Sequence, residues 1–521
     1  MNFINPNTNI KFCHVNWNND YVDCLDFKTK DEQEAYFNSI ASKTIFCDEY
    51  TFLKKDNRII VNFGIEELIN INYLFYKNPQ EDITFYCFIT EKNYKNENAT
   101  ELLIETDVFQ TWQFALNFKA CFIERSHVDN DTIGLHTFPE MLESGEYIEH
   151  DHINLNFLDQ KYYVVGVSES GLNTYTIPDE GRFYNGLYSG LTYLVFNDST
   201  SISNYIKCVQ KNLGGDNIYC IFVNPKSMFP EIKFTQYKEN NLSFQMGILP
   251  DFIGAKTLNT YTLNKRYTTI DGYTPKNNKL FCYPYNYFFI TNNAGSAVDF
   301  RYELFNSDSC DFVLNGCVTP GGDLKLIPQN YKNISSNYSE GVDVGKLPTC
   351  SWNNDSYTNW LTQNAVNIPI GVASNLGTAV GSAMVGDVGG AVGGLMGIFN
   401  QVGQIYAQST IPQTTKGGSN QGVLNFANLE GLSIYTCSIK SEYAKIIDDF
   451  FTMFGYKINR VAVPNYKSRS NFNYIKLINA KPFGDIYPDD LQKLKNIFES
   501  GVTIWHKPTE MFDYTKNNTI L

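Results

Sequence analysis

The sequence predicts a mainly β protein with a few helices and one long apolar loop insertion. Short runs of β-branched and aromatic residues fill the first two thirds of the chain, and clusters of Asn, Gly, Asp and Pro separate them. Runs and turn residues in this order are typical of strands joined by turns. A chain of 521 residues also exceeds what one hydrophobic core serves, so we expect about three or four domains.

The expected strands are apolar runs rich in Ile, Val, Phe and Tyr. They are residues 59–63, 83–89, 161–167, 217–223 and 279–285. Polar turn residues bound each run, which favours strands over buried helices.

Two amphipathic helices are expected near the C-terminal end. From Ser441 to Phe454, apolar side chains recur at the spacing of one helical face, and Gly455 follows as a terminator. The second helix runs from about Pro488 to Ser500, with acidic residues in its first turn and Gly501 after it. Residues 502–505 then predict a closing strand.

One segment differs from the rest of the chain because it is almost free of charge. From Leu347 to Thr415 there is no lysine or arginine, and after Asp355 the one charged side chain is Asp387. Its centre, residues 365–399, consists mostly of Gly, Ala, Val, Ser, Leu and Met. A soluble domain has little use for such a segment on its surface, which points to a membrane.

Residues 366–406 are long enough for two membrane spans joined near Gly386 and Asp387. A hydrocarbon core of about 30 Å requires roughly 20 helical residues per span. Glycines recur at four-residue spacing in this window, which lets helix backbones approach closely in lipid. The residues predicted to form the membrane-penetrating loop are Val366, Ile368, Ile370, Val372, Leu376, Gly377, Val380, Gly381, Met384, Val385, Gly386, Gly390, Val392, Gly394, Leu395, Met396, Gly397, Ile398 and Phe399.

Glycine is a poor helix former in water, and Gly, Ala and Ser gain little by leaving it. One copy of the segment is therefore expected to insert only marginally, whereas several copies acting together insert better. Two other interpretations stay open, namely a buried glycine-rich helical hairpin and a disordered low-complexity loop.

The formal net charge of -14 argues against a DNA-binding protein, because an acidic surface repels nucleic acid. The same charge suits a surface that DNA must slide past. The first residues lack both a basic start and an apolar core, so we expect synthesis in the cytoplasm. Twelve scattered cysteines without a C-x-x-C pair predict buried free thiols.

No residues assemble into a convincing active site, so we predict no enzyme activity, no cofactor and no metal. Strand alternation places His150 and His152 on one face, as a metal site needs, but the absence of further spaced ligands favours a solvated loop. Carboxylates are plentiful, yet a glycosidase pair depends on distances that the sequence does not give.

A basic stretch from Tyr456 to Gly484 holds six cations and no acid, interleaved with aromatic residues. Its cations are Lys457, Arg460, Lys467, Arg469, Lys476 and Lys481. Such a pattern grips a nucleic-acid backbone in some proteins. In an acidic chain, a patch facing acidic surface on a neighbouring subunit is the favoured interpretation.

Two blocks of the chain resemble a known family. The first is Glu105-Thr106-Asp107-Val108-Phe109-Gln110-Thr111-Trp112 with residues 122–128. The second includes residues 455–461, Phe472-Asn473-Tyr474 and Gly501-Val502-Thr503-Ile504-Trp505-His506. In these segments the chain is similar to the tail-knob or lower-collar (distal tail tube) proteins of small short-tailed phages that infect Gram-positive bacteria. Between the blocks the match is loose but keeps its order, with Tyr283-Pro284-Tyr285 followed later by the apolar insert.

The resemblance implies β-barrel-like phage tail-tube domains that assemble as a homo-hexamer at the tail tip of the virion. Its apolar loops plug the tube and then penetrate the host cytoplasmic membrane, while genomic DNA passes through the lumen without specific binding. Other tail and collar proteins are the further partners. With the polar passages as borders, we expect an N-terminal tube domain (1–128), a middle or distal β-rich domain (129–345), the apolar insertion (346–420) and a C-terminal α/β segment completing the tube domain (421–521).

The resemblance implies no catalytic role for Trp112, Arg125, Arg460 or Trp505. We expect the two tryptophans in a barrel core, and the two arginines either as buried ion-pair partners or as contacts between subunits. An alternative function is a receptor-binding or cell-wall-glycan-degrading tail protein. A secreted pore-forming toxin shares the apolar insert but requires a signal peptide.

Overall fold

The computed structural model describes residues 3–351 and 432–521, apart from short gaps. The gaps are residue 6 and residues 48–51, 54–56, 80, 157–159, 179–182, 185–186, 213–216, 251–255, 294, 317, 319–321 and 347–348. Every residue of the predicted membrane-penetrating loop, from Val366 to Phe399, lies outside the described residues.

The chain divides into two compact units. The first unit combines Met1–Leu142 with Ile446–Leu521, and the second unit is Glu143–Lys445. Both ends of the chain therefore fold together, and the segment between them folds as a unit of its own.

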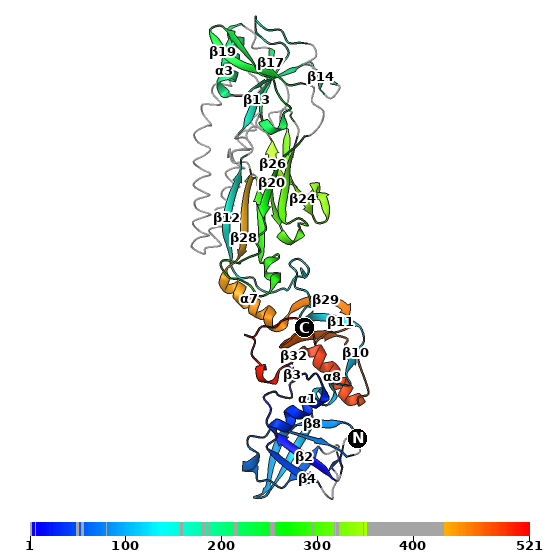
Figure 1. The fold of residues 1–521 in the computed structure, drawn as a ribbon. Helices are drawn as coiled ribbons and strands as arrows, with labels where there is room; N and C mark the ends of the chain where they lie inside the picture. Colours follow the sequence, from blue (N-terminus) through cyan, green and yellow to red (C-terminus); the bar gives the residue numbers. More distant parts are fainter. Residues whose placement is uncertain are drawn as a thin grey trace. The chain divides into compact units, whose positions relative to one another are not determined.

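A six-stranded antiparallel sheet forms much of the first unit, in the order β4-β2-β7-β8-β9-β6 (Figure 1). Its strands are β2 (Thr8–Cys13), β4 (Lys43–Cys47), β6 (Arg58–Val61), β7 (Tyr73–Lys77), β8 (Thr84–Asn96) and β9 (Ala99–Thr106). Side chains alternate between two cores: Leu74 and Phe85 enter one, whereas Tyr73 and Tyr86 enter the other with Phe37 of helix α1 (Lys30–Ile40). The sheet is thus apolar on both faces.

A five-stranded sheet joins the two ends of the chain in the order β29-β11-β30-β32-β3. It contains β3 (Asp23–Leu25), β11 (Cys121–Ser126), β29 (Tyr456–Ala462), β30 (Phe472–Ile478) and β32 (Val502–Trp505). β3 runs parallel to β32, with Leu25 opposite Trp505. Helix α7 (Ser441–Phe454) precedes β29 along the chain, and helix α8 (Pro488–Ser500) lies between β30 and β32. Leu494 and Phe498 of α8 enter the same core as Leu74 and Phe85.

The second unit contains a six-stranded sheet in the order β18-β19-β16-β13-β17-β27. Its strands are β13 (Lys161–Val167), β16 (Thr192–Phe196), β17 (Ile218–Pro225), β18 (Thr235–Glu239), β19 (Leu242–Ile248) and β27 (Thr349–Ser351). Helix α3 (Ser199–Lys211) packs on one face through Tyr205 and Val209. Asp198 caps the start of α3 by accepting a bond from the Ser201 amide.

Two further sheets complete the second unit. One has the order β12-β28-β21-β22, and the other the order β20-β23-β24-β25 with β26 also paired to β24. Their strands are β12 (Tyr147–Leu155), β20 (Lys256–Asn264), β21 (Asn286–Thr291), β22 (Ala297–Phe300), β23 (Ser309–Gly316), β24 (Asp323–Tyr331), β25 (Ile334–Ser336), β26 (Val342–Lys346) and β28 (Leu432–Ile439). Phe288, Ile290 and Phe312 join the two sheets in one hydrophobic core.

Three short antiparallel pairs lie outside the large sheets. They are β1 (Phe3–Ile4) with β5 (Phe52–Leu53), β10 (Asn117–Phe118) with β31 (Pro482–Phe483), and β14 (Phe183–Tyr184) with β15 (Leu187–Tyr188). A short helix α2 (Val108–Trp112) follows β9 directly.

The mainly β class is confirmed, as are both C-terminal helices and the strand at residues 502–505. Four of the five expected strands also form, as β6, β8, β13 and β17. The prediction for residues 279–285 is wrong, because a 3-10 helix (Asn278–Phe281) and a turn occupy them and β21 begins only at Asn286. The apolar character of this run reflects burial of Leu280, Phe281 and Tyr285, not strand pairing.

Candidate functional site around the apolar insert

Two strands lie on either side of residues 352–431, which contain most of the predicted apolar insert, and they belong to different sheets of the second unit. β27 ends at Ser351 as the edge strand beside β17, with Cys220 opposite Ser351. β28 begins at Leu432 as an inner strand between β12 and β21. The chain therefore leaves one sheet at its edge and returns to the middle of another, so folded structure holds the insert at both ends.

β28 is buried along its whole length, on both of its faces. Leu432 and Ile434 point to the core that contains Phe288 and Ile290. The alternate side chains, including Tyr435 and Cys437, are buried on the other face of the sheet. We call this second face the outer face; the register places Phe289 of β21 and His152 of β12 on it, beside Tyr435.

The outer face carries a stack of flat side chains. The Tyr435 ring lies 4.8 Å from the Phe289 ring at an interplanar angle of 13°, and 4.4 Å from the His152 ring at 8°. Burial raises the pKa of the neighbouring Cys437 thiol to about 12, and the charges of Glu149 and Asp299 add to the shift. This face of the sheet is therefore packed with stacked aromatic side chains where β12, β28 and β21 meet.

The two histidines considered for a metal lie on different sides of β12. A bulge between Glu149 and Asp151 breaks the alternation of the strand. His150 contacts the Ser438 hydroxyl at 2.6 Å, whereas His152 stacks on Tyr435. The expected placement on one face is therefore wrong, and within the described residues no group of three His, Cys, Asp or Glu side chains gathers around a metal position.

In the first unit, Asp107, one of the residues that carry the family resemblance, lies at the centre of a buried polar network. Its carboxylate caps α2 by accepting bonds from the Phe109 and Gln110 amides, and it accepts further bonds from Tyr73 at 2.8 Å and Trp17 at 3.3 Å. Burial raises the pKa of Asp107 to about 6, against the lowering effect of these bonds. Four donors around one carboxylate fix the turn from β9 into α2.

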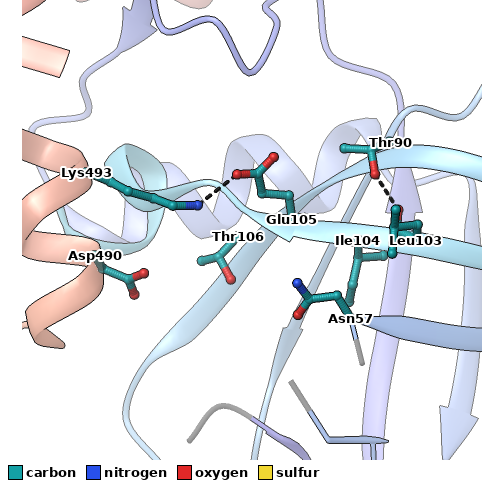
Figure 2. Close-up of a pocket in the computed structure, with 8 residues that line it drawn as sticks. All are labelled: Asn57, Thr90, Leu103, Ile104, Glu105, Thr106, Asp490 and Lys493. Atoms are coloured by element: carbon teal, nitrogen blue, oxygen red, sulfur yellow. Dashed lines mark hydrogen bonds and ion pairs between the residues drawn. The ribbon is translucent and has the colours of Figure 1, made fainter. Parts of the chain in front are cut away.

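The same motif ties β9 and α2 to helix α8. The Trp112 indole donates a hydrogen bond to Asp490 at 2.9 Å, and Lys493 pairs with Glu105 at 2.7 Å. Figure 2 shows a cavity of about 170 Å³ that is lined by Asp490 and Lys493 of α8, by residues 103–106 of β9, and by Asn57 and Thr90. The Lys493–Glu105 ion pair and the buried Asp490 carboxylate line this cavity. These charged groups hold β9, α2 and α8 together, and we call them the clamp.

The two tryptophans and two arginines of the resemblance lie in different environments. Trp112 and Trp505 are buried in cores as expected, and the Trp505 indole donates to Asp23 at 2.7 Å. Arg125 is a buried ion-pair partner of Glu140 and donates to the Gly455 carbonyl at 2.7 Å. Arg460 is exposed on β29.

The basic stretch finds many of its partners inside the first unit. Lys467 pairs with Asp26 at 3.3 Å and Lys476 with Glu124 at 3.0 Å. Arg469 donates to the Val128 and Asn518 carbonyls. These contacts hold the C-terminal strands in place, which explains much of the positive charge without a nucleic acid.

Two further features concern the thiols and the helices of the described residues. The nine cysteines whose side chains the structure describes are free thiols, and eight of them are buried, which confirms that prediction for this part of the chain. Within the described residues, no helix combines the length and apolarity needed to cross a bilayer.

Sequence reasoning missed the outer face and the Asp107 network. A cap was visible in principle, because Asp107 directly precedes a short apolar helix. Its other donors, Tyr73 and Trp17, are distant in sequence, so no local signal reveals them. The outer face depends on sheet register, which joins β12 and β28 across almost three hundred residues.

Comparison with known proteins matches two families. Residues 249–519 match the C-terminal domain of the tail knob protein gp9 of Bacillus phage phi29, and residues 6–117 match the N-terminus of caudoviral major tail proteins. The chain is 25% identical to the tail knob protein gp9 of Bacillus phage B103 over 98% of both chains. It is 26% identical to the same protein of Bacillus phage phi29 over 96% of both chains. The structure of the bacteriophage C1 tail knob protein gp12 shares the fold, with a TM-score of 0.65, 17% identity and coverage of 99% of this chain and 100% of that chain.

Proposed function

Because this chain belongs to the phage tail knob family and is a structural component of the tail, we propose that it forms the distal tail tube through which the genome is ejected. In this proposal six copies form the tube, and their apolar inserts first plug it and then enter the host cytoplasmic membrane. The observation that carries the proposal is the nearly charge-free segment from Leu347 to Thr415, most of which lies between β27 and β28 in the sequence.

The position of the insert supports a role that leaves the fold intact. Both flanking strands pair with neighbours that lie outside the insert, β27 with β17 and β28 with β12 and β21. Entry of the insert into a membrane would therefore break none of those ladders. Glycine-rich helices that gain little individually become effective when several copies associate in lipid.

The charge of the chain supports passage of DNA through the tube. A net charge of -14 repels the phosphate backbone at distances below the Debye length of about 8 to 10 Å. Two cations of the basic stretch, Lys467 and Lys476, have their charge compensated by Asp26 and Glu124 inside the first unit, which reduces the attraction of this stretch for DNA. We therefore propose a non-enzymatic conduit that DNA traverses without specific binding.

The test is leakage of a dye from liposomes, measured for the intact chain, a 366–405 deletion and Gly390→Glu. Leakage should require the insert, and Gly390→Glu should abolish it, because each copy would carry a charge into the hydrocarbon at a cost of up to roughly 2.5 to 3.5 kcal/mol. Gly390→Ala is the matched control and should leak like the intact chain, since alanine is small and favours helix.

Electron microscopy of the same samples checks that each variant still assembles as a tube. If neither the intact chain nor the deletion causes dye leakage, although protease reaches the insert, membrane penetration would be contradicted. Adsorption to purified cell walls in that case would support a receptor-binding tail protein instead.

A further inference from the structure

We propose that neighbouring copies of this chain meet through the two opposite ends of the sheet β29-β11-β30-β32-β3 in the first unit. At the β29 end an apolar surface carries cations, and at the β3 end of the next copy an apolar surface carries acids. This interface rests on the proposed function, because only an assembled tube requires it.

The β29 end of the sheet exposes a row of apolar side chains across three strands. The register places Phe122 of β11 opposite both Val461 of β29 and Ile478 of β30, so the three share one face. Val461 is 69% exposed and Ile478 is 42% exposed, and Val463, just after β29, is 62% exposed. β29 is also an edge strand, paired only with β11 among the strands that the structure describes. Exposed apolar side chains beside an open edge mark a site for another chain.

Cations surround this row, and we call the row and its cations the basic surface. Arg460 lies on β29, and Lys119 and Lys481 lie where the ladder continues beyond the row, with the Lys119 amide donating to the Lys481 carbonyl at 3.0 Å. All three are exposed, and none of them pairs with an acid among the residues that the structure describes. Glu124 of β11 is already paired with Lys476 at 3.0 Å. The basic surface therefore offers positive charge to an acidic partner.

The β3 end of the same sheet carries the complementary surface. Val22, which precedes β3, is 55% exposed, and Phe512 is 45% exposed. The Phe512 ring lies 6.0 Å from the Trp505 ring, whose indole donates to Asp23. Phe512 also has a φ of 71°, which bulky residues rarely adopt outside functional positions. Asp20 and Asp23 pair with no cation of the described residues, and we call Val22, Phe512 and these two acids the acidic surface.

Charge and geometry select a second copy of this chain as the partner. Strand register places Asp23 on the same face as Val461 and Ile478. The two surfaces lie at opposite ends of the sheet, four strand spacings of about 4.8 Å apart, or about 19 Å, so they do not meet within one chain. A contact between unlike surfaces of successive copies is heterologous, and it generates a ring when the rotation closes.

Cross-linking of introduced cysteines tests the contact directly. The assembled full-length chain with both Val22→Cys and Val461→Cys is treated with a bismaleimide shorter than the sheet is wide, and a denaturing gel separates the products. A ladder of dimers and higher species should form, at least about tenfold above the background of native thiols in the intact chain, because exposed thiols react far faster than buried ones.

Each single variant should stay at that background, since every joint needs one cysteine from each surface. The matched control pairs Val22→Cys with Ile69→Cys, because Ile69 is 67% exposed in the same unit and belongs to neither surface. Products from Val461→Cys alone would identify a contact between like surfaces and would overturn the proposal. A ladder from the Ile69→Cys control as strong as that from the test pair would overturn it too.

A charge exchange gives a second test that does not depend on thiols. Arg460→Glu should raise the concentration for half-assembly by about tenfold in native mass spectrometry, because it sets an acid against Asp20 of the next copy. Adding Asp20→Arg to the same chain should restore assembly to within about threefold of the intact chain. Both side chains are exposed, so the folded subunit should keep its stability in denaturant. Unchanged assembly of Arg460→Glu would contradict the interface.

The interface and the tube fail in different ways. An intact chain that stays monomeric would remove the proposed tube and this interface with it. An intact chain that assembles, with neither a ladder nor an effect of Arg460→Glu, would remove the interface alone and leave the tube.

Discussion

The turn from β9 into α2 and the outer face beside β28 are both buried, but different forces hold them. At the turn, charged and polar side chains lock segments distant in sequence: Asp107 binds Tyr73 and Trp17, and Trp112 binds Asp490. At the outer face, Tyr435 is held by ring stacking with Phe289 and His152. Directional bonds tolerate little movement, whereas apolar contact is non-directional. The comparison therefore contrasts directional hydrogen bonds in the first unit with apolar ring contacts in the second.

The largest effect expected at the rigid turn follows from Asp107→Ala. The substitution removes a helix cap and leaves buried donors of Tyr73 and Trp17 without their acceptor, which should cost about 3 kcal/mol or more of unfolding free energy. Denaturant unfolding followed by tryptophan fluorescence measures it, since the buried Trp17, Trp112 and Trp505 all belong to the first unit. Asp107→Asn keeps an acceptor and should lose less. A cost below about 1 kcal/mol for Asp107→Ala would remove the contrast between the two regions.

A smaller effect is expected from pH, and it comes from His127. Its Nδ1 accepts from the Tyr474 amide at 2.7 Å, its Nε2 lies 3.0 Å from the Thr452 carbonyl, and burial lowers its pKa from 6.5 to about 3. Below pH 6.5 the unfolded state therefore binds a proton at His127 that the native state does not. The free energy of unfolding should fall progressively as the pH drops below 6.5, by about 2 kcal/mol at pH 5. His127→Gln should remove this dependence in urea unfolding series.

Asp107 has the opposite sign. Burial raises its pKa from 3.8 to about 6, so the native state binds more protons than the unfolded state in that window. Its contribution is fully present below pH 3.8 and is lost as the pH rises through about 6, which offsets part of the His127 loss. Asp107→Asn should therefore lose more stability than the intact chain between pH 7 and pH 5. Equal losses would mean that Asp107 does not titrate there.

The smallest effect is expected at the exposed end of the clamp. Lys493 and Glu105 pair at 2.7 Å, but their side chains are 47% and 38% exposed. Solvent screens such a pair, so Lys493→Met should cost less than about 1 kcal/mol and the cost should shrink in high salt. A loss as large as that of Asp107→Ala would show that the ion pair, and not the buried carboxylate, holds the turn.

Local patterns in the sequence predict much of this fold because each element fits its own neighbours. Helix α7 shows its apolar spacing directly, and β13 and β17 show their β-branched runs. The run at residues 279–285 misleads because burial in a turn and burial in a strand select the same side chains. Composition alone therefore does not separate the two.

The candidate site is less accessible to sequence reasoning because its contacts are long-range. Asp107 meets Tyr73 and Trp17 only after β7, β9 and the N-terminal segment have paired and packed. The bulge in β12 that separates His150 from His152 leaves no clear mark in the sequence. The insert itself is the opposite case, since its lack of charge is visible in the sequence, whereas its position between β27 and β28 requires the fold.

The measurement that tests the account most directly is leakage of a dye from liposomes, compared between the assembled full-length protein and its 366–405 deletion. The account predicts that leakage requires the insert, because the nearly charge-free segment is the part of the chain that enters the bilayer. Equal leakage from the two proteins would contradict it, since another part of the chain would then permeabilise the membrane.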